Sequence, residues 1–527
     1  MKFICIITFL VASLIAVPDL TGQEEETTKP LELPNYVIEG KGQINVRSGV
    51  KQYPGIVEKL TAAELDSINS LQKEQTVLLP PKPLPERIFV IPKRKGFIAG
   101  SFGSYITPNL EGGYNFAVNR YKMFANAKLD ISSGDPINSD YSKLTAGIKS
   151  EYLAPEKFFI FGGSITNTNL NFVYNNYNLY ASRTAPDRTL FNMLLSVKSK
   201  GNYQGYDFRT GGHYSYMNMT TEGNSLSDNG LNAYLHFNNY WRDFLIGGGA
   251  EIDFHSLRGN GMSYITLKAN GQYRRDKLIF DAAAGLQFGN TTRDATLFNF
   301  LIDLSGKFML NKEFTFSGRF LMNMENSNFQ QYYKINPYIS DTAFFDYPVL
   351  TELSAKMNYH PVDDILIAFG ASFGGKARHP YFENADSATF ILKYGSSTLF
   401  NIFSEGNWYL SDVDALIYQI QMNMNYIDGK TIPYAVPLLV SASYNRRWFE
   451  KLGTTIGANY ISSRFVNLEN TKEISGYIDI FFNADYKINE KFNIFIKLNN
   501  LLNQNIYIWN GYRERGLFFS GGVLYRF

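Results

Sequence analysis

The stretch Leu416–Tyr426, with the sequence LIYQIQMNMNY, alternates between large apolar and polar side chains. In a β-strand, successive side chains point to opposite faces, so residues two apart share a face. One face would carry Leu416, Tyr418, Ile420, Met422, Met424 and Tyr426, and the opposite face includes Gln419, Gln421, Asn423 and Asn425. The stretch therefore predicts a strand with one apolar and one amide-rich face.

The same alternation recurs from Gly96 to the C-terminal Phe527, most clearly in Ile265–Tyr273, Ile474–Tyr486 and Phe492–Leu498. These segments approach the roughly 9–11 residues that a tilted strand needs to cross a bilayer. Aromatic residues make up 16% of the chain, with 36 Tyr and 42 Phe, and aromatic girdles at two membrane interfaces would use many of them. These features favour a transmembrane barrel over a soluble sandwich.

The connections between the segments alternate between short and mostly longer ones, as in bacterial barrels with short periplasmic turns and long outer loops. Short connections are expected near residues 118–120, 154–156, 200–202, 241–243, 275–277, 311–313, 361–363, 411–413, 450–452 and 489–491. Longer ones are expected at 168–188, 219–228, 326–347, 377–387, 427–435, 464–471 and 503–513. The fold predicted is all-β: an antiparallel transmembrane barrel of about 22 strands over residues 96–527, with both termini periplasmic.

The N-terminal part of the chain predicts export. A basic Met1-Lys2 precedes the apolar segment Phe3–Val17, and Pro18 and Gly22 follow, which is typical of a secretory signal peptide, here residues 1–22. Residues 23–95 are expected to form a mostly extended periplasmic leader. The leader contains one short helix from the capping box at Thr61–Glu64 and a Pro-rich linker. The expected location is the outer membrane of a Gram-negative cell.

The last strands carry the most specific resemblance. The segments Asn459–Phe465 and Leu498–Asn503, then Tyr507, Trp509 and the terminal Tyr525-Arg526-Phe527, resemble the closing strands of TonB-dependent receptors. Leu33–Gly40 is similar to the segment of that family to which the energy-coupling protein TonB adds a strand. The resemblance implies TonB as a partner at Tyr36, Val37 and Ile38. The chain departs from the family because residues 23–95 are too short for a full plug domain, so the plug is absent or reduced to this leader.

The C-terminal strand resembles the signal read by the barrel-assembly machinery. Leu517, Phe519, Val523, Tyr525 and Phe527 share one face, and the chain ends on an aromatic residue. Tyr525 and Phe527 are therefore the candidate assembly signal. The expected partners of the barrel are this machinery and outer-membrane lipid.

The sequence offers no convincing catalytic, metal or cofactor site. Gly370–Gly374 matches G-x-S-x-G, but it lies in an alternating segment without the strand-to-helix turn that a nucleophile elbow requires. The five histidines are scattered, and the one cysteine, Cys5, lies in the signal segment, so no zinc-ligand spacing is present. The net charge of +2 indicates no nucleic-acid partner. The chain is interpreted as a protein that is not an enzyme.

Ligand contacts would come from the lumen face and the long loops. Two loops are rich in aromatic side chains, namely Tyr332, Tyr333, Tyr338, Tyr507, Trp509 and Tyr512. They suit either ligand platforms or an outer girdle, so no ligand-binding residue is assigned. The leading hypothesis is receptor-like uptake of an unknown solute across the outer membrane. The alternatives are a passive porin-like channel and a structural or adhesive barrel whose loops bind a partner.

Overall fold

The computed structural model describes residues 30–31, 91–92, 95–293, 295–342 and 344–527. The signal segment, the short helix predicted near residue 61 and the candidate coupling residues Tyr36–Ile38 lie outside the described residues. Of the leader, the structure describes β1 (Pro30–Leu31) and β2 (Ile91–Pro92), which pair in parallel. The rest of this section concerns the barrel.

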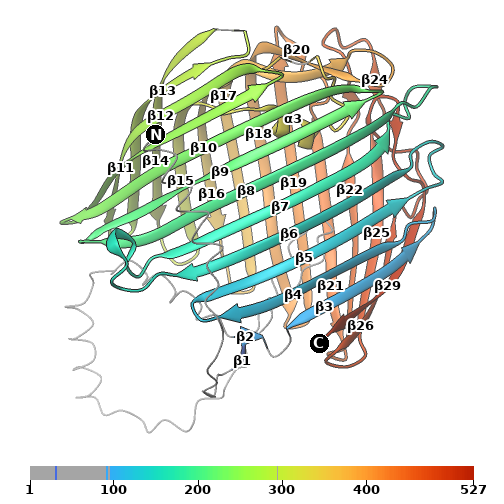
Figure 1. Ribbon diagram of the computed structural model, residues 1–527, viewed down its shortest axis with the longest axis horizontal. Helices are drawn as coiled ribbons and strands as arrows, with labels where there is room; N and C mark the ends of the chain where they lie inside the picture. The colour runs from blue at the N-terminus through green and yellow to red at the C-terminus, as the bar shows by residue number, and fades with distance from the viewer. Residues whose placement is uncertain (1–29, 32–90, 93–94, 294, 343) are drawn as a thin grey trace, which may run out of the picture. The chain divides into compact units, whose positions relative to one another are not determined.

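The described residues from Gly96 onward form one closed antiparallel barrel (Figure 1). Its strands are β3 (Gly96–Gly103), β4 (Asn109–Val118), β5 (Tyr121–Ser132), β6 (Tyr141–Leu153), β7 (Ile165–Asn178), β8 (Asp187–Tyr203), β9 (Tyr206–Thr221), β10 (Asn224–Trp241), β11 (Phe244–Leu257), β12 (Asn260–Arg275), β13 (Leu278–Asn290), β14 (Thr296–Met309), β15 (Phe314–Met324), β16 (Val349–Tyr359), β17 (Ile365–Asn384), β18 (Phe390–Ser411), β19 (Asp414–Ile427), β21 (Leu438–Trp448), β22 (Leu452–Ile461), β25 (Tyr477–Lys487), β26 (Phe492–Asn499) and β29 (Phe518–Arg526). These 22 strands confirm the predicted fold class.

Shorter elements lie in the connections between these strands. They are the 3-10 helix η1 (Phe159–Phe161), the helix α3 (Phe329–Ile335), and the two-to-three-residue strands β20 (Lys430–Thr431), β23 (Arg464–Phe465), β24 (Glu473–Ile474), β27 (Tyr507–Trp509) and β28 (Tyr512–Arg513). Among them, β20 extends the barrel sheet by pairing with β19, β23 pairs with β24, and β27 pairs with β28.

The barrel closes between its last and first strands. β29 runs antiparallel to β3, with partners from Ser520↔Gly103 to Arg526↔Phe97. Beyond this ladder, the backbone amides and carbonyls of Phe527 and Gly96 bond reciprocally, both at 3.0 Å. Closure leaves no unpaired strand edge, which is the condition for a sheet to span a bilayer.

The predicted alternation gives each strand of the barrel wall an outward and an inward face. In β10, Leu231, Leu235 and Phe237 point outward and are 47–56% exposed, whereas Asn232 between them is 4% exposed. The apolar set faces the surroundings and the polar set faces the lumen. An outward apolar band with a polar interior is the arrangement of a membrane barrel.

Two features of the connections differ from the sequence prediction. Residues 168–188, 219–228 and 377–387, expected as longer connections, are largely strand. β7 continues to Asn178, and β9 and β10 meet in a tight turn at Glu222-Gly223 with φ of +47° and +85°. At the end of the β9–β10 hairpin Asn218 and Ser227 point outward while Met217, Met219 and Leu226 are buried. The apolar-outward pattern therefore ends there although pairing continues. Conversely, the connection at 154–164, expected to be short, contains η1.

Candidate functional site

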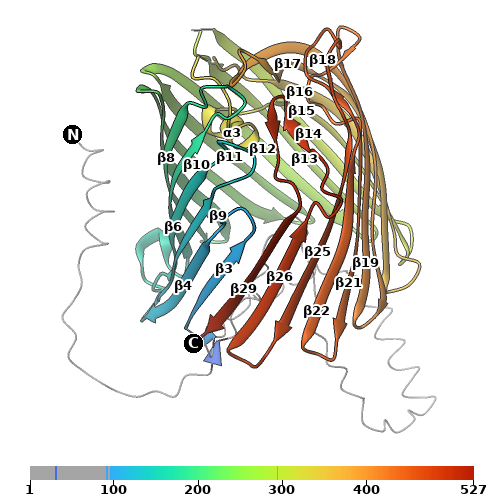
Figure 2. The same ribbon diagram turned by 90° about the vertical axis from the view of Figure 1, so that its right-hand side faces the viewer.

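The connection between β15 and β16, residues 325–348, folds into one mouth of the barrel and is called the inward loop. Figure 2 shows its helix α3 inside the wall, at the end opposite the C-terminus. The Asn328 side chain caps this helix by accepting a hydrogen bond from the Gln331 amide at 3.1 Å, which satisfies a donor that the helix leaves free. Four of the seven helical residues are buried, so the loop packs as part of the interior.

Arg188, on β8, fixes the middle of the inward loop. Its side chain is 1% exposed and donates to the carbonyl oxygens of Pro337 at 3.0 Å and Ile339 at 2.9 Å. Its Nε also donates to the Thr221 hydroxyl at 2.9 Å, and the Tyr177 hydroxyl donates to Pro337 at 2.6 Å. Hydrogen bonds from an ionised donor are stronger than neutral ones, so the middle of the loop is firmly bound to the wall.

The start of the inward loop is tethered to β12 and β13 of the wall. The Tyr264 hydroxyl donates to the Met324 carbonyl at 2.7 Å. Gln287 both donates to that carbonyl at 3.1 Å and accepts from the Met324 amide at 2.7 Å. Gln287 is fully buried, and an unpaired buried amide is costly, so these bonds fix where the loop leaves β15.

A buried cluster of one histidine and two aspartates lies beside the inward loop, between these two tethers. His255 on β11 lies 3.2 Å from an oxygen of Asp228 and 2.9 Å from an oxygen of Asp253. Its Nε2 also lies 3.3 Å from the side-chain nitrogen of Asn328, the residue that caps α3. All four side chains are buried. The helix is therefore docked on a polar cluster of the wall.

The hairpin of β27 and β28, residues 507–513, packs against the inward loop and is called the lid hairpin. The ring of Tyr512 stacks on Tyr338 of the inward loop, with centroids 3.4 Å apart and planes 13° apart. Trp509 is 9% exposed, and its ring centroid lies 5.2 Å from that of Phe390 and 4.7 Å from that of Tyr434. The two loops thus form one aromatic core across the mouth.

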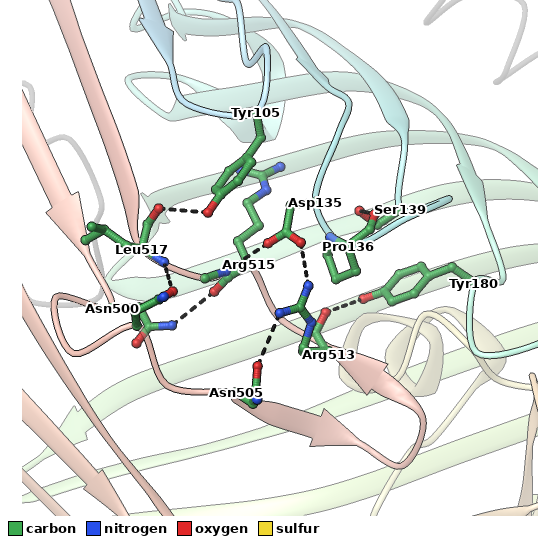
Figure 3. A network of polar contacts seen from close by, with 12 residues as sticks. Tyr105, Asp135, Pro136, Ser139, Tyr180, Asn500, Asn505, Arg513, Arg515 and Leu517 are labelled. Carbon is green, nitrogen blue, oxygen red and sulfur yellow. Dashed lines mark hydrogen bonds and ion pairs between the residues drawn. The ribbon is translucent and has the colours of Figure 1, made fainter.

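Polar contacts anchor the base of the lid hairpin, as Figure 3 shows. Arg513 forms an ion pair with Asp135, and its carbonyl accepts from the Tyr180 hydroxyl at 3.0 Å. The Asn500 side chain donates to the Arg515 carbonyl at 3.1 Å. The two contacts of Arg513 join segments more than 300 residues apart in the chain. The lid therefore depends on the closed barrel to hold its position.

The aromatic core keeps its hydroxyls neutral. Burial raises the pKa of Tyr180 to about 12 and that of Tyr332 to about 12. Burial also raises the pKa of Tyr338 and Tyr512. At physiological pH these side chains act as hydrogen-bond donors and flat apolar surfaces.

Known structures share this barrel. The FrpB iron transporter of Neisseria meningitidis has a TM-score of 0.66 at 9% identity, with 82% of this chain and 81% of that chain covered. The copper transporter OprC gives 0.64 at 11% identity, with 82% and 81% covered. The ferric-catecholate import receptor Fiu of E. coli K12 gives 0.62 at 9% identity, with 83% of each chain covered. No family model and no curated relative matches.

The fold is that of the TonB-dependent receptor barrels. The resemblance read from the closing strands is therefore confirmed for the fold. Identities of 9–11% show the fold alone.

The aromatic side chains of the two predicted loops come together at the mouth of the barrel. Tyr332, Tyr333, Tyr338, Trp509 and Tyr512 belong to the aromatic core of the mouth, so they are not an outer girdle. Two buried arginines of the mouth, Arg188 and Arg464, were missed by sequence reasoning. A single arginine beside a predicted loop carries no signal of burial, which arises only when distant strands close around it.

The other sequence-predicted residues are found as follows. Tyr525 lies in β29 and Phe527 directly follows it, with the Phe527 ring 42% exposed; their role as an assembly signal stays a prediction. Gly370–Gly374 lies within β17, which is followed by β18 and not by a helix. Within the described residues, no group of His, Cys, Asp or Glu is arranged to hold a metal ion, and no helix is long and apolar enough to cross a membrane.

Proposed function

We propose that this chain is an outer-membrane import receptor that takes up a solute through its barrel. The two loops that pack together at one mouth of the barrel carry this proposal. The inward loop and the lid hairpin meet through Tyr338 and Tyr512 and are tethered to the wall by buried groups such as Arg188. A passive pore needs an open path, whereas a receptor opens when its solute and an energy source act on it. Proteins of the same fold include iron and copper transporters and a ferric-catecholate import receptor.

In this proposal, both termini are periplasmic and the loops lie outside the cell. TonB pairs with the leader at Tyr36, Val37 and Ile38, and the leader serves as a reduced plug. The barrel-assembly machinery inserts the chain into outer-membrane lipid by reading Tyr525 and Phe527. These assignments extend the resemblance of the closing strands and of Leu33–Gly40 to TonB-dependent receptors.

Planar-bilayer conductance of the purified full chain tests whether these loops block ion flow through the barrel. The expected result is no steady large conductance for the wild type. A variant in which residues 326–347 are replaced by a short Gly-Ser linker is expected to show larger or more frequent openings. A matched control replaces residues 155–163, the η1 connection at the other end of the barrel, with a linker of the same type. A steady large pore in the wild type would contradict the proposal and favour the porin-like alternative.

A binding assay with the periplasmic domain of TonB tests energy coupling without knowledge of the solute. The wild type is expected to retain TonB on an affinity resin, because backbone pairing with an extended segment supplies the binding energy. Replacement of Tyr36, Val37 and Ile38 together by glycine is expected to abolish retention. Replacement of Glu24, Glu25 and Glu26 by glycine is the control. Equal retention by all three forms would contradict coupling at Tyr36–Ile38.

A further inference from the structure

Arg464 is a buried cation of the mouth that has no acidic partner among the described residues. It lies in β23 and is 4% exposed. Its Nη2 donates to the carbonyl oxygens of Tyr507 at 2.7 Å and Ile508 at 3.0 Å. Its Nη1 is buried and has no hydrogen-bond partner. A buried ion is costly unless it is paired and fully hydrogen-bonded, so this guanidinium is incompletely satisfied.

Arg188 is equally buried and also bonds no carboxylate, but none of its nitrogens is left buried without an acceptor. Two other cations near the mouth are paired with carboxylates. Arg513 pairs with Asp135, and Arg258 pairs with Asp341 at 3.1 Å. The nearby carboxylate of Glu383 accepts from the Lys393 ammonium at 2.5 Å and from the Leu468 amide at 2.9 Å. Glu383 is therefore already engaged. The positive charge of Arg464 is left for a group that comes from outside the described residues.

The aromatic core contacts the segment that carries this cation. Tyr434 is linked to the residue after Arg464, since its amide donates to the Phe465 carbonyl at 2.7 Å. The Tyr434 ring in turn lies against Trp509 of the lid hairpin, 4.7 Å between centroids. Both carbonyls bound by Arg464 also belong to the lid hairpin or its edge. Because both acceptors of Nη2 lie on the lid hairpin, a movement of the hairpin away from Arg464 would leave Nη2 as well as Nη1 without an acceptor.

We propose that Arg464 recognises an oxyanion, a carboxylate or a phosphate, carried by the solute that enters the mouth. In the closed state the carbonyl oxygens of Tyr507 and Ile508 accept the hydrogen bonds of Arg464 in place of the oxyanion. An incoming oxyanion replaces them, because a planar guanidinium presents paired N–H donors that match a carboxylate or phosphate. Binding then favours the lifted lid. This inference rests on the proposed import function, and it names the chemistry of the solute.

Tryptophan fluorescence tests the site in the full-length protein, with sodium benzoate as the probe and benzamide as its neutral analogue. The chain has four tryptophans. Trp241, Trp408 and Trp448 are 38–61% exposed on the barrel, and their replacement by phenylalanine leaves Trp509 as the reporter. Benzoate is expected to shift the Trp509 emission to longer wavelength in a saturable way, because the lid lifts. Benzamide is expected to give no saturable shift.

Three variants decide whether Arg464 binds the probe. Arg464→Met is expected to weaken benzoate binding at least about tenfold, since charge-assisted hydrogen bonds are lost. Arg464→Lys keeps the charge and is expected to bind more weakly than the wild type but more tightly than Arg464→Met. Arg258→Met removes one paired positive charge of the mouth and is expected to bind as the wild type does.

The outcomes separate the site from the transport function. No saturable shift in the wild type, or benzoate affinity unchanged in Arg464→Met, would overturn the oxyanion site. An equal response to benzoate and benzamide would also overturn it, because the charge would then be irrelevant. A second titration with inorganic phosphate distinguishes a general oxyanion site, which responds, from one restricted to carboxylates. Fluorescence requires no TonB and no uptake, so a failure of import leaves this result standing.

Discussion

Arg188 should control how often the mouth opens. Arg188→Met keeps much of the apolar stem but removes three hydrogen bonds, two of them to carbonyls of the inward loop at Pro337 and Ile339. Hydrogen bonds that involve a charged group contribute about 1.5–3 kcal/mol each, and neighbouring bonds do not add fully. A net loss of about 3 kcal/mol would raise the ratio of open to closed loop about 100-fold.

Single-channel recording in planar bilayers measures this ratio. Arg188→Met is expected to open at least about tenfold more often than the wild type, which allows for partial repacking around methionine. Arg183→Met is the matched control, because Arg183 lies on the neighbouring connection and is exposed. Equal opening frequencies in the wild type and in Arg188→Met would refute the role of these hydrogen bonds in holding the loop.

Three further results are expected. Replacing Tyr338 and Tyr512 by leucine, singly and together, should give a coupling free energy of about 0.5–1.5 kcal/mol in a double-mutant cycle of lid opening, as for stacked aromatic pairs; additive effects would contradict the stack. His255→Leu leaves its two buried aspartates unpaired and should destabilise the barrel by about 3–5 kcal/mol, seen as a lower temperature of heat modification on gels, whereas an unchanged temperature would argue against the cluster. Phe527→Ala should reduce the amount of heat-modifiable barrel in outer-membrane fractions several-fold, with Phe449→Ala as the control; equal amounts would reject the assembly signal.

The sequence by itself determined the wall of this protein. In Leu416–Tyr426 and Ile474–Tyr486 the alternation is local, because the side-chain period of a strand depends only on the residues of that strand. The closing segment ending at Phe527 likewise carried the resemblance that the solved structures confirm for the fold. Sequence reasoning placed loops near residues 219–228 and 377–387, where the strands continue beyond the outward apolar band. At the first of these the contrast is reversed, since Met217, Met219 and Leu226 are buried inside and Asn218 and Ser227 point outward.

Only the tertiary structure decided what happens inside the wall. The sequence marked Tyr338 and Tyr512 as loop aromatics but left open whether they faced a ligand or the membrane. Barrel closure brings the inward loop and the lid hairpin together and stacks these rings. Closure also buries Arg188 and Arg464, whose partners lie up to 151 residues away. Such burial depends on strand register summed around the whole barrel, and no local pattern encodes it.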